Sequence, residues 1–116
     1  MIKVFHLATC STCQRILKEW APGPEVQMRE IKSAPITEEE IDKMKELAGS
    51  YEALFSRRAM KYRGMGLHEM ELTEADYRKY ILEEYTFLKR PVVLTDDQVF
   101  VGNTKKVVAA AASVFQ

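Results

Sequence analysis

Two cysteines lie three positions apart near the start of the chain, in the stretch HLATCSTCQRILKEW, and they are the only cysteines among its 116 residues. A thiol becomes a good nucleophile only as a thiolate. The first turn of a helix stabilises that anion through its unpaired N–H groups and its dipole. Cys10 precedes an expected helix, and Cys13 lies about one turn further along it. This spacing predicts an exposed, attacking Cys10 and a more buried Cys13 that resolves a mixed disulfide formed at Cys10.

Two other interpretations of the cysteine pair are a metal site and simple packing. A structural zinc ion needs four ligands, and the remaining candidates of suitable type, His6 and His68, show no ligand-like spacing. Free cysteines are also often buried as small apolar residues. We favour the redox or thiol role because the pair follows a strand and opens a helix, and we expect no metal.

The elements that must position the cysteines follow from the hydrophobic periodicity. Residues 2–7 predict a short, mostly buried strand, and residues 11–20 predict a helix that Ser11 or Thr12 can cap. Apolar residues that alternate through 26–31 predict a second strand. Strand, helix and strand form a β-α-β unit, whose two strands should be parallel.

The middle of the chain is predicted to be helical, and its end returns to strands. One helix runs from an N-cap at Thr37 to a stop at Gly49, and Thr73 caps another, with a basic loop at 56–64 between them. Two apolar runs within 91–102 predict a β-hairpin, and an alanine-rich helix closes the chain. This order is that of an α/β, thioredoxin-like (glutaredoxin-like) three-layer fold. We expect a single domain over 1–116, with a mixed four-stranded sheet and a helical insertion at about 37–88.

The composition excludes several classes of protein. The chain is 47% hydrophobic and 29% charged, which is ordinary for a globular domain and unlike a disordered one. Its 17 Lys and Arg balance 17 Asp and Glu, so no overall charge attracts it to nucleic acid or to a membrane, and neither partner is expected. No segment approaches the roughly 18 apolar residues of a membrane span, and the N-terminus is unlike a secretory signal. We therefore expect a cytoplasmic protein.

Three segments together resemble the ArsC/Spx/YffB family of thioredoxin-fold proteins: FHLATCSTCQRILKEW, LFSRRAMKYRGMGL and LKRPVVL. Their order and separation match over essentially the whole chain. The resemblance implies a thioredoxin-like fold with an inserted helical subdomain. From the family's arsenate reductases it also implies a cysteine that attacks bound arsenate, no bound cofactor, and glutathione with glutaredoxin as the reductant.

The resemblance also assigns roles to individual residues. Cys10 matches the family's nucleophile and His6 a histidine that precedes it, while either Arg57 or Arg58 matches a central arginine. Arg90 and Pro91 match a late RP motif whose proline is typically cis and lies beside the cysteine. Arginine forks and a helix N-terminus suit an oxyanion because they supply several fixed donors. The expected catalytic residues are Cys10, Cys13, His6 and Arg90, and the expected substrate-binding residues are Arg57, Arg58, Arg90, Pro91, Ser11 and Thr12.

Two departures from the family pattern leave two functions open. Cys13 stands where the reductases usually have serine, as in the Spx regulators. The segment VGNTKK, where the reductases carry a third arginine, offers only Lys105 and Lys106, and lysine does not reproduce a guanidinium fork. We favour a thiol-dependent reductase whose Cys10 acts on an oxyanion or a mixed disulfide. The alternative is an Spx-like redox-sensing regulator that binds the RNA polymerase alpha subunit through a Cys10–Cys13 switch.

Overall fold

The computed structural model describes all 116 residues, and the chain divides into two compact units. The first, which we call the sheet unit, comprises Met1–Ala34 and Arg90–Gln116. The second, which we call the helical unit, comprises Pro35–Lys89 and contains the segment expected as a helical insertion. No helix of either unit combines the length and the apolar character that crossing a membrane requires.

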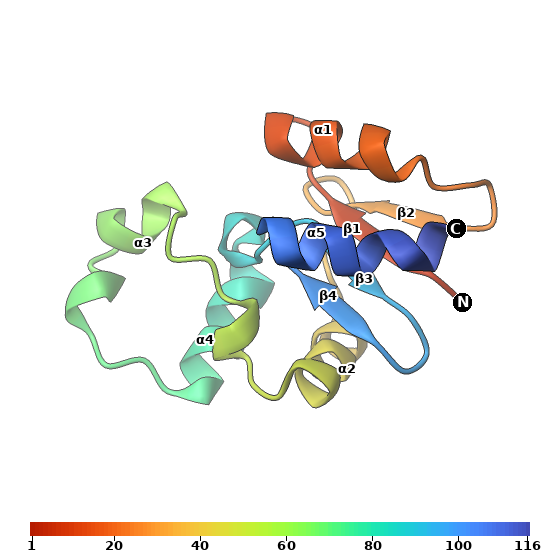
Figure 1. The fold of residues 1–116 in the computed structure, drawn as a ribbon. Coiled ribbons are helices and arrows are strands. Elements are labelled where there is room, and N and C mark those ends of the chain that lie inside the picture. Colours follow the sequence, from red (N-terminus) through yellow and green to blue (C-terminus); the bar gives the residue numbers. More distant parts are fainter. The chain divides into compact units, whose positions relative to one another are not determined.

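The sheet unit is built on a mixed four-stranded sheet (Figure 1). Its strands are β1 (Lys3–His6), β2 (Gln27–Glu30), β3 (Val92–Leu94) and β4 (Val99–Val101), in the spatial order β2-β1-β3-β4. β1 is parallel to β2 and antiparallel to β3, and β4 is antiparallel to β3. The predicted β-α-β unit, its parallel strands, the hairpin and the mixed sheet are therefore confirmed.

Helices α1 (Ser11–Trp20) and α5 (Lys105–Ala112) share one hydrophobic core with one face of this sheet. Val4, Val93 and Phe100 are partners across three neighbouring strands, so their side chains lie on the same face. Burial of apolar surface against this face is the main force that holds the two helices on the sheet. The core also includes Ile16, Leu17 and Trp20 of α1 and Val108, Ala111 and Ala112 of α5.

Trp20 fixes the end of α1 to the C-terminal segment of the chain. Its indole N–H donates to the carbonyl oxygen of Val108 at 3.1 Å, and its ring stacks on Phe115 with centroids 5.1 Å apart. Buried tryptophans pack best where their N–H finds an acceptor. α1, which follows Cys10 and contains Cys13 in its first turn, is thereby held at its other end.

Strand β2 is shorter than the predicted segment 26–31 and lies at the edge of the sheet. Val26 and Ile31 flank it and are buried, whereas Met28 within it is 44% exposed. The alternation of apolar residues therefore marks the position of the strand but not a buried side chain at Met28, because Val26 belongs to the core shared with α1 and α5 and Met28 does not.

The helical unit contains α2 (Glu38–Ala48), α3 (Met60–Gly64) and α4 (Glu74–Glu83). The predicted N-caps are confirmed, because Thr37 and Thr73 each accept from the third helical residue in a complete capping box. Gly49 ends α2 with a φ of 101°, a left-handed conformation that glycine adopts without strain. The three-residue 3₁₀ turns of this unit are Glu52–Leu54, Leu67–Glu69 and Tyr85–Phe87.

The basic loop expected at 56–64 is wrong in its second half, where residues 60–64 form α3. None of the five residues of α3 is buried. A helix this short that covers no apolar surface leaves no hydrophobic periodicity in the sequence, which explains why the pattern does not predict it.

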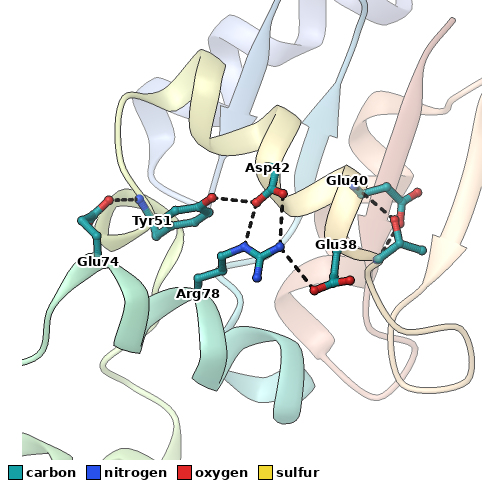
Figure 2. Close-up of polar contacts among 7 residues, drawn as sticks. Glu38, Glu40, Asp42, Tyr51, Glu74 and Arg78 are labelled. Atoms are coloured by element: carbon teal, nitrogen blue, oxygen red, sulfur yellow. Dashed lines mark hydrogen bonds and ion pairs between the residues drawn. The ribbon is translucent and has the colours of Figure 1, made fainter.

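One carboxylate joins α2, α4 and the segment between α2 and α3 (Figure 2). Asp42 accepts from Nε and a terminal nitrogen of Arg78 at 2.8 and 3.1 Å, and from the hydroxyl of Tyr51 at 2.6 Å. Glu74 of α4 accepts the backbone N–H of Tyr51 at 2.7 Å. The hydrogen bonds from Arg78 and Tyr51 lower the pKa of Asp42 to about 2, so this carboxylate is ionised throughout the neutral range.

Candidate active site

A tight turn between β1 and α1 presents Cys10. The backbone N–H of Cys10 donates to the carbonyl oxygen of Leu7 at 3.1 Å and closes the turn. Gln14 of α1 donates its side-chain amide to the carbonyl oxygens of Leu7 and Ala8 at 3.4 and 3.3 Å. The turn that carries Cys10 is therefore bonded both within itself and to the first turn of the helix.

The N-cap of α1 differs from the prediction. Cys10 is the N-cap, with φ −90° and ψ 109°, and Ser11 and Thr12 are the first two helical residues. The expectation that Ser11 or Thr12 caps the helix is therefore wrong, because the helix begins directly after the turn that Leu7 and Cys10 close. The side chain of Cys10 makes no capping hydrogen bond, but as the N-cap residue it lies beside the free N–H groups of the first turn of α1.

The pKa of Cys10 lies below that of an ordinary thiol, although its partial burial opposes ionisation. The backbone N–H of Cys13 and the thiol of Cys13 stabilise the anion, and the charge and hydrogen bond of Arg90 add to this effect. These groups come from the first turn of α1 and from the residue before Pro91. Cys10 is partly exposed, so this thiolate is accessible.

Cys13 has the opposite character. It is fully buried, and burial, reinforced by the nearby charge of Cys10, raises its pKa to about 11. The backbone N–H of Leu7 opposes this shift but does not outweigh it. Both cysteines are free thiols. The predicted difference in burial is confirmed, and at neutral pH Cys13 holds the proton while Cys10 gives its proton up more readily.

His6 lies at the end of β1, and burial lowers its pKa while the charge of Glu30 acts in the opposite direction. Its Nδ1 atom is buried and has no hydrogen-bond partner. The imidazole is therefore neutral at neutral pH and adds no positive charge to the site. A role for His6 in catalysis remains a prediction from the sequence.

Arg90 and Pro91 bring the end of the chain to Cys10. The Arg90–Pro91 peptide bond is cis, as the resemblance implies, and Arg90 interacts with the sulfur of Cys10. Gly102 donates its backbone N–H to the carbonyl oxygen of Pro91 at 3.0 Å and has a φ of 96°. The buried residue Pro91 is thus held from the far end of β4, which fixes the backbone from which Arg90 extends.

The two central arginines belong to the helical unit and differ in their partners there. Arg57 is exposed and donates to a carboxylate oxygen of Glu52 at 2.7 Å and to the hydroxyl of Tyr77 at 2.9 Å. Arg58 is also exposed and has no hydrogen-bond or ion-pair partner. A substrate role for either arginine, and for Ser11 or Thr12, remains a prediction from the sequence.

One residue at the site is missing from the set predicted by sequence. Glu30, at the end of β2, accepts the backbone N–H of Ala8 in the turn before Cys10 at 2.8 Å. The only feature of the sequence that could have indicated a role for Glu30 is an acidic residue at the end of a predicted strand, before a polar turn. No group of three or more His, Cys, Asp or Glu residues is arranged to hold a metal ion.

Comparison with known proteins agrees with this architecture. A YFFB protein superposes with a TM-score of 0.80 over 100% of both chains at 18% identity. An arsenate reductase from Vibrio cholerae superposes with a TM-score of 0.76 at 17% identity. The match covers 94% of this chain and 95% of the reductase chain. A protein from Bacteroides fragilis described as ArsC family related superposes with a TM-score of 0.72 at 26% identity. The match covers 90% of this chain and 92% of the Bacteroides chain. No protein of curated function is similar enough in sequence to count as a relative.

These similarities show the ArsC-like thioredoxin fold that the order of elements predicts. Identities of 17 and 18% do not by themselves establish an activity. The sequence gives independent support, since the model of the ArsC family matches residues 5–111 and so includes Cys10, Cys13 and Arg90. Because that match spans nearly the whole chain, from β1 to α5, this protein belongs to the ArsC family.

Proposed function

We propose that the protein is a thiol-dependent reductase in which the thiolate of Cys10 attacks a mixed disulfide or an oxyanion. The observation that carries the proposal is the unequal pair at the start of α1. The backbone N–H and thiol of Cys13 together with Arg90 lower the pKa of Cys10, whereas burial raises the pKa of Cys13, which keeps its proton. Catalytic thiols lie in such electropositive, partly exposed environments, whereas structural cysteines do not.

With a disulfide substrate the reaction takes two exchange steps. The thiolate of Cys10 attacks one substrate sulfur, forms a mixed disulfide and expels the other sulfur as a thiolate. Cys13 then loses its proton to that leaving group or to water and attacks the sulfur of Cys10. This step forms the Cys10–Cys13 disulfide and expels the second substrate thiolate. The substrate gains two electrons, and an external thiol such as glutathione, with glutaredoxin, returns the protein to the dithiol.

With an arsenate-like oxyanion, Cys10 displaces one oxygen as water and forms a sulfur–arsenic bond. A second thiol, from Cys13 or glutathione, then attacks the sulfur of Cys10, and the electron pair of the broken bond stays on arsenic and reduces it by two electrons. Arg90 would supply paired donors to the oxyanion. The segment VGNTKK adds no arginine, so the disulfide is the better supported substrate.

Of the two central arginines, Arg58 is the better candidate to bind a substrate anion. The guanidinium of Arg57 is already engaged by Glu52 and Tyr77, whereas that of Arg58 has no competing partner. Comparing Arg58→Met with Arg57→Met tests this assignment. We expect the Arg58 variant to raise KM for an anionic substrate more than the Arg57 variant does, and the reverse order would contradict the assignment.

The test of the reductase is a coupled assay. The reduced protein is incubated with arsenate or with hydroxyethyl disulfide in the presence of glutathione, glutaredoxin, glutathione reductase and NADPH, and NADPH loss is followed. Turnover should disappear in Cys10→Ser. Cys13→Ser should accumulate a mixed disulfide at Cys10 that is visible by mass spectrometry. If neither substrate gives turnover above the Cys10→Ser control, the proposal is wrong.

The alternative function, a redox-sensing regulator, would use the same two thiols, Cys10 and Cys13. Because the thiol of Cys13 interacts with the sulfur of Cys10, an oxidant could join them without a substrate, which is what a redox switch needs. The partner in that case is the RNA polymerase alpha subunit. Purified alpha subunit should bind the oxidised and reduced protein with different affinities, and equal or absent binding in both states would exclude this role.

A further inference from the structure

The carboxylate of Glu30 divides its two oxygens between two segments of the backbone. One oxygen accepts the N–H of Ala8 at 2.8 Å. The other accepts the N–H groups of Lys32 and Ser33, both at 2.9 Å, and the hydroxyl of Ser33 at 3.1 Å. One side chain therefore satisfies four donors, three of them in the turn after β2 and one in the turn before α1.

The hydrogen bond from Ala8 links Glu30 to the turn that carries Cys10. Ala8 lies inside the turn from Leu7 to Cys10, and that turn determines where α1 begins. The same turn carries Cys10, whose thiolate is favoured by the backbone N–H of Cys13 and by Arg90. A shift of the turn would move the sulfur relative to both groups, and the interactions that stabilise a thiolate weaken steeply with distance and angle.

The carboxylate is suited to this task because it is always charged. Its backbone hydrogen bonds, that from Ala8 first, lower the pKa of Glu30 to about 2, so it accepts these donors across the whole range in which a thiol reacts. His6 on β1, the strand beside β2, is the titratable group that feels its charge. Because His6 is neutral, the carboxylate of Glu30 interacts mainly with its backbone N–H donors.

We propose that Glu30 is a positioning residue for Cys10: by holding Ala8 with one oxygen and the turn after β2 with the other, it fixes the sulfur against the N–H of Cys13 and the guanidinium of Arg90. This inference rests on the proposed function, because it assigns Glu30 a part in activating the same thiol. Glu30 contacts no substrate and acts only through the backbone of the turn.

The direction in which the pKa of Cys10 changes when the carboxylate of Glu30 is removed separates a positioning role from a simple charge effect. Removing a negative charge near a thiol should, by Coulomb's law alone, make the thiol easier to ionise. Loosening the turn does the reverse, because Cys10 loses part of its contact with Cys13 and Arg90. The positioning role therefore predicts that loss of the Glu30 carboxylate raises the pKa of Cys10.

The experiment measures the rate at which iodoacetamide alkylates Cys10 as a function of pH in the full chain, with the site identified by mass spectrometry. Glu30→Met keeps the length of the side chain and removes both acceptors. We expect its Cys10 titration to move up by half a pH unit or more, which is a loss of about threefold in the thiolate fraction at neutral pH. Exchange of the Ala8 amide hydrogen should become faster in the same variant.

Two controls isolate the contact with Ala8. Glu25→Met removes an equal charge just before β2 and should leave the titration of Cys10 unchanged. Ser33→Ala removes a donor from the other oxygen of Glu30 and should also leave it unchanged. If Glu30→Met does not fold, Glu30→Asp provides the comparison, because its shorter carboxylate cannot reach both backbone segments, and the same upward shift is expected.

The outcomes separate this inference from the proposed function. If Glu30→Met loses stability but its Cys10 titrates as in the wild type, or titrates lower, Glu30 is a structural acceptor only and the inference is wrong. If Glu30→Met still turns over substrate and the pKa of its Cys10 is unchanged, the proposed reductase function holds and the positioning role of Glu30 is wrong. A raised Cys10 titration in a protein that reduces neither substrate would keep the positioning role and remove the proposed reaction.

Discussion

Cys13 acts on the sulfur of Cys10 twice, through its backbone N–H and through its thiol, while its own side chain is completely buried. Both interactions favour an anion at Cys10, while burial raises the pKa of Cys13 and keeps the proton on its thiol. The same charge on Cys10 in turn disfavours ionisation of Cys13. The pair therefore has a built-in order, in which Cys10 reacts first and Cys13 reacts only after Cys10 has lost its charge.

The first prediction concerns the relative reactivity of the two thiols. The pKa of Cys13 is about 11, and that of Cys10 lies below the ordinary thiol value. A gap of two or more pKa units makes the thiolate fraction of Cys10 at pH 7 roughly a hundredfold larger, or more. Alkylation with iodoacetamide, read by mass spectrometry, should modify Cys10 almost exclusively. Equal labelling of both cysteines in the folded protein would contradict the assignment.

The second prediction concerns the guanidinium of Arg90. Arg90→Met removes a charge and a hydrogen bond from Cys10, so the pKa of Cys10 should rise and its reaction at neutral pH should slow. Arg90→Lys should restore part of the effect, because it keeps the charge but not the fork. Arg15→Met is the matched control, since it removes an equal charge from the exposed side of α1. An unchanged pH profile in Arg90→Met would show that Arg90 does not activate the thiol.

The third prediction concerns the acid limit of the helical unit. The pKa of Asp42 is about 2 in the folded protein and near 3.9 when unfolded, so its contribution to stability is complete above about pH 4 and is lost as the pH falls through 2. Asp42→Asn should lower the unfolding temperature at pH 7, and the difference from the wild type should shrink toward pH 2. Circular dichroism melts at several pH values measure this.

Glu39→Gln provides the control for Asp42, because Glu39 lies exposed on the same helix. At pH 7 its unfolding temperature should fall by less than that of Asp42→Asn, because Glu39 makes no such hydrogen bonds. A constant difference between Asp42→Asn and the wild type from pH 7 to pH 2 would mean that the carboxylate of Asp42 is not the titrating group that supports the unit.

The fourth prediction concerns the start of α2. The hydroxyl of Thr37 accepts the backbone N–H of Glu40 at 3.1 Å, and the carboxylate of Glu40 accepts the N–H of Thr37 at 2.9 Å. Thr37→Ala should reduce the free energy of unfolding by about 0.5–2 kcal/mol in urea denaturation. Thr37→Ser keeps the hydroxyl and should retain most of the stability. Equal losses in the two variants would show that the methyl group, not the cap, matters there.

Much of the local structure could be predicted because it depends on residues close in sequence. The caps at Thr37 and Thr73, the stop at Gly49 and the hairpin around residues 95–98 all arise from hydrogen bonds and backbone preferences within a few positions. The hydrophobic pattern does not predict α3, because none of its residues is buried. The pattern also places the cap of α1 one or two residues too late, because the turn that Leu7 closes decides where that helix begins.

The sequence alone determined the two thiols, their spacing, and the helix and strands that surround them, since periodicity and short motifs encode these features directly. Which groups act on Cys10 depends on contacts between distant segments of the fold. Arg90 reaches it because β3 pairs with β1, and Glu30 reaches Ala8 because β2 pairs with the other edge of β1. Neither contact leaves a local pattern, because each is made by strand pairing between segments far apart in the chain.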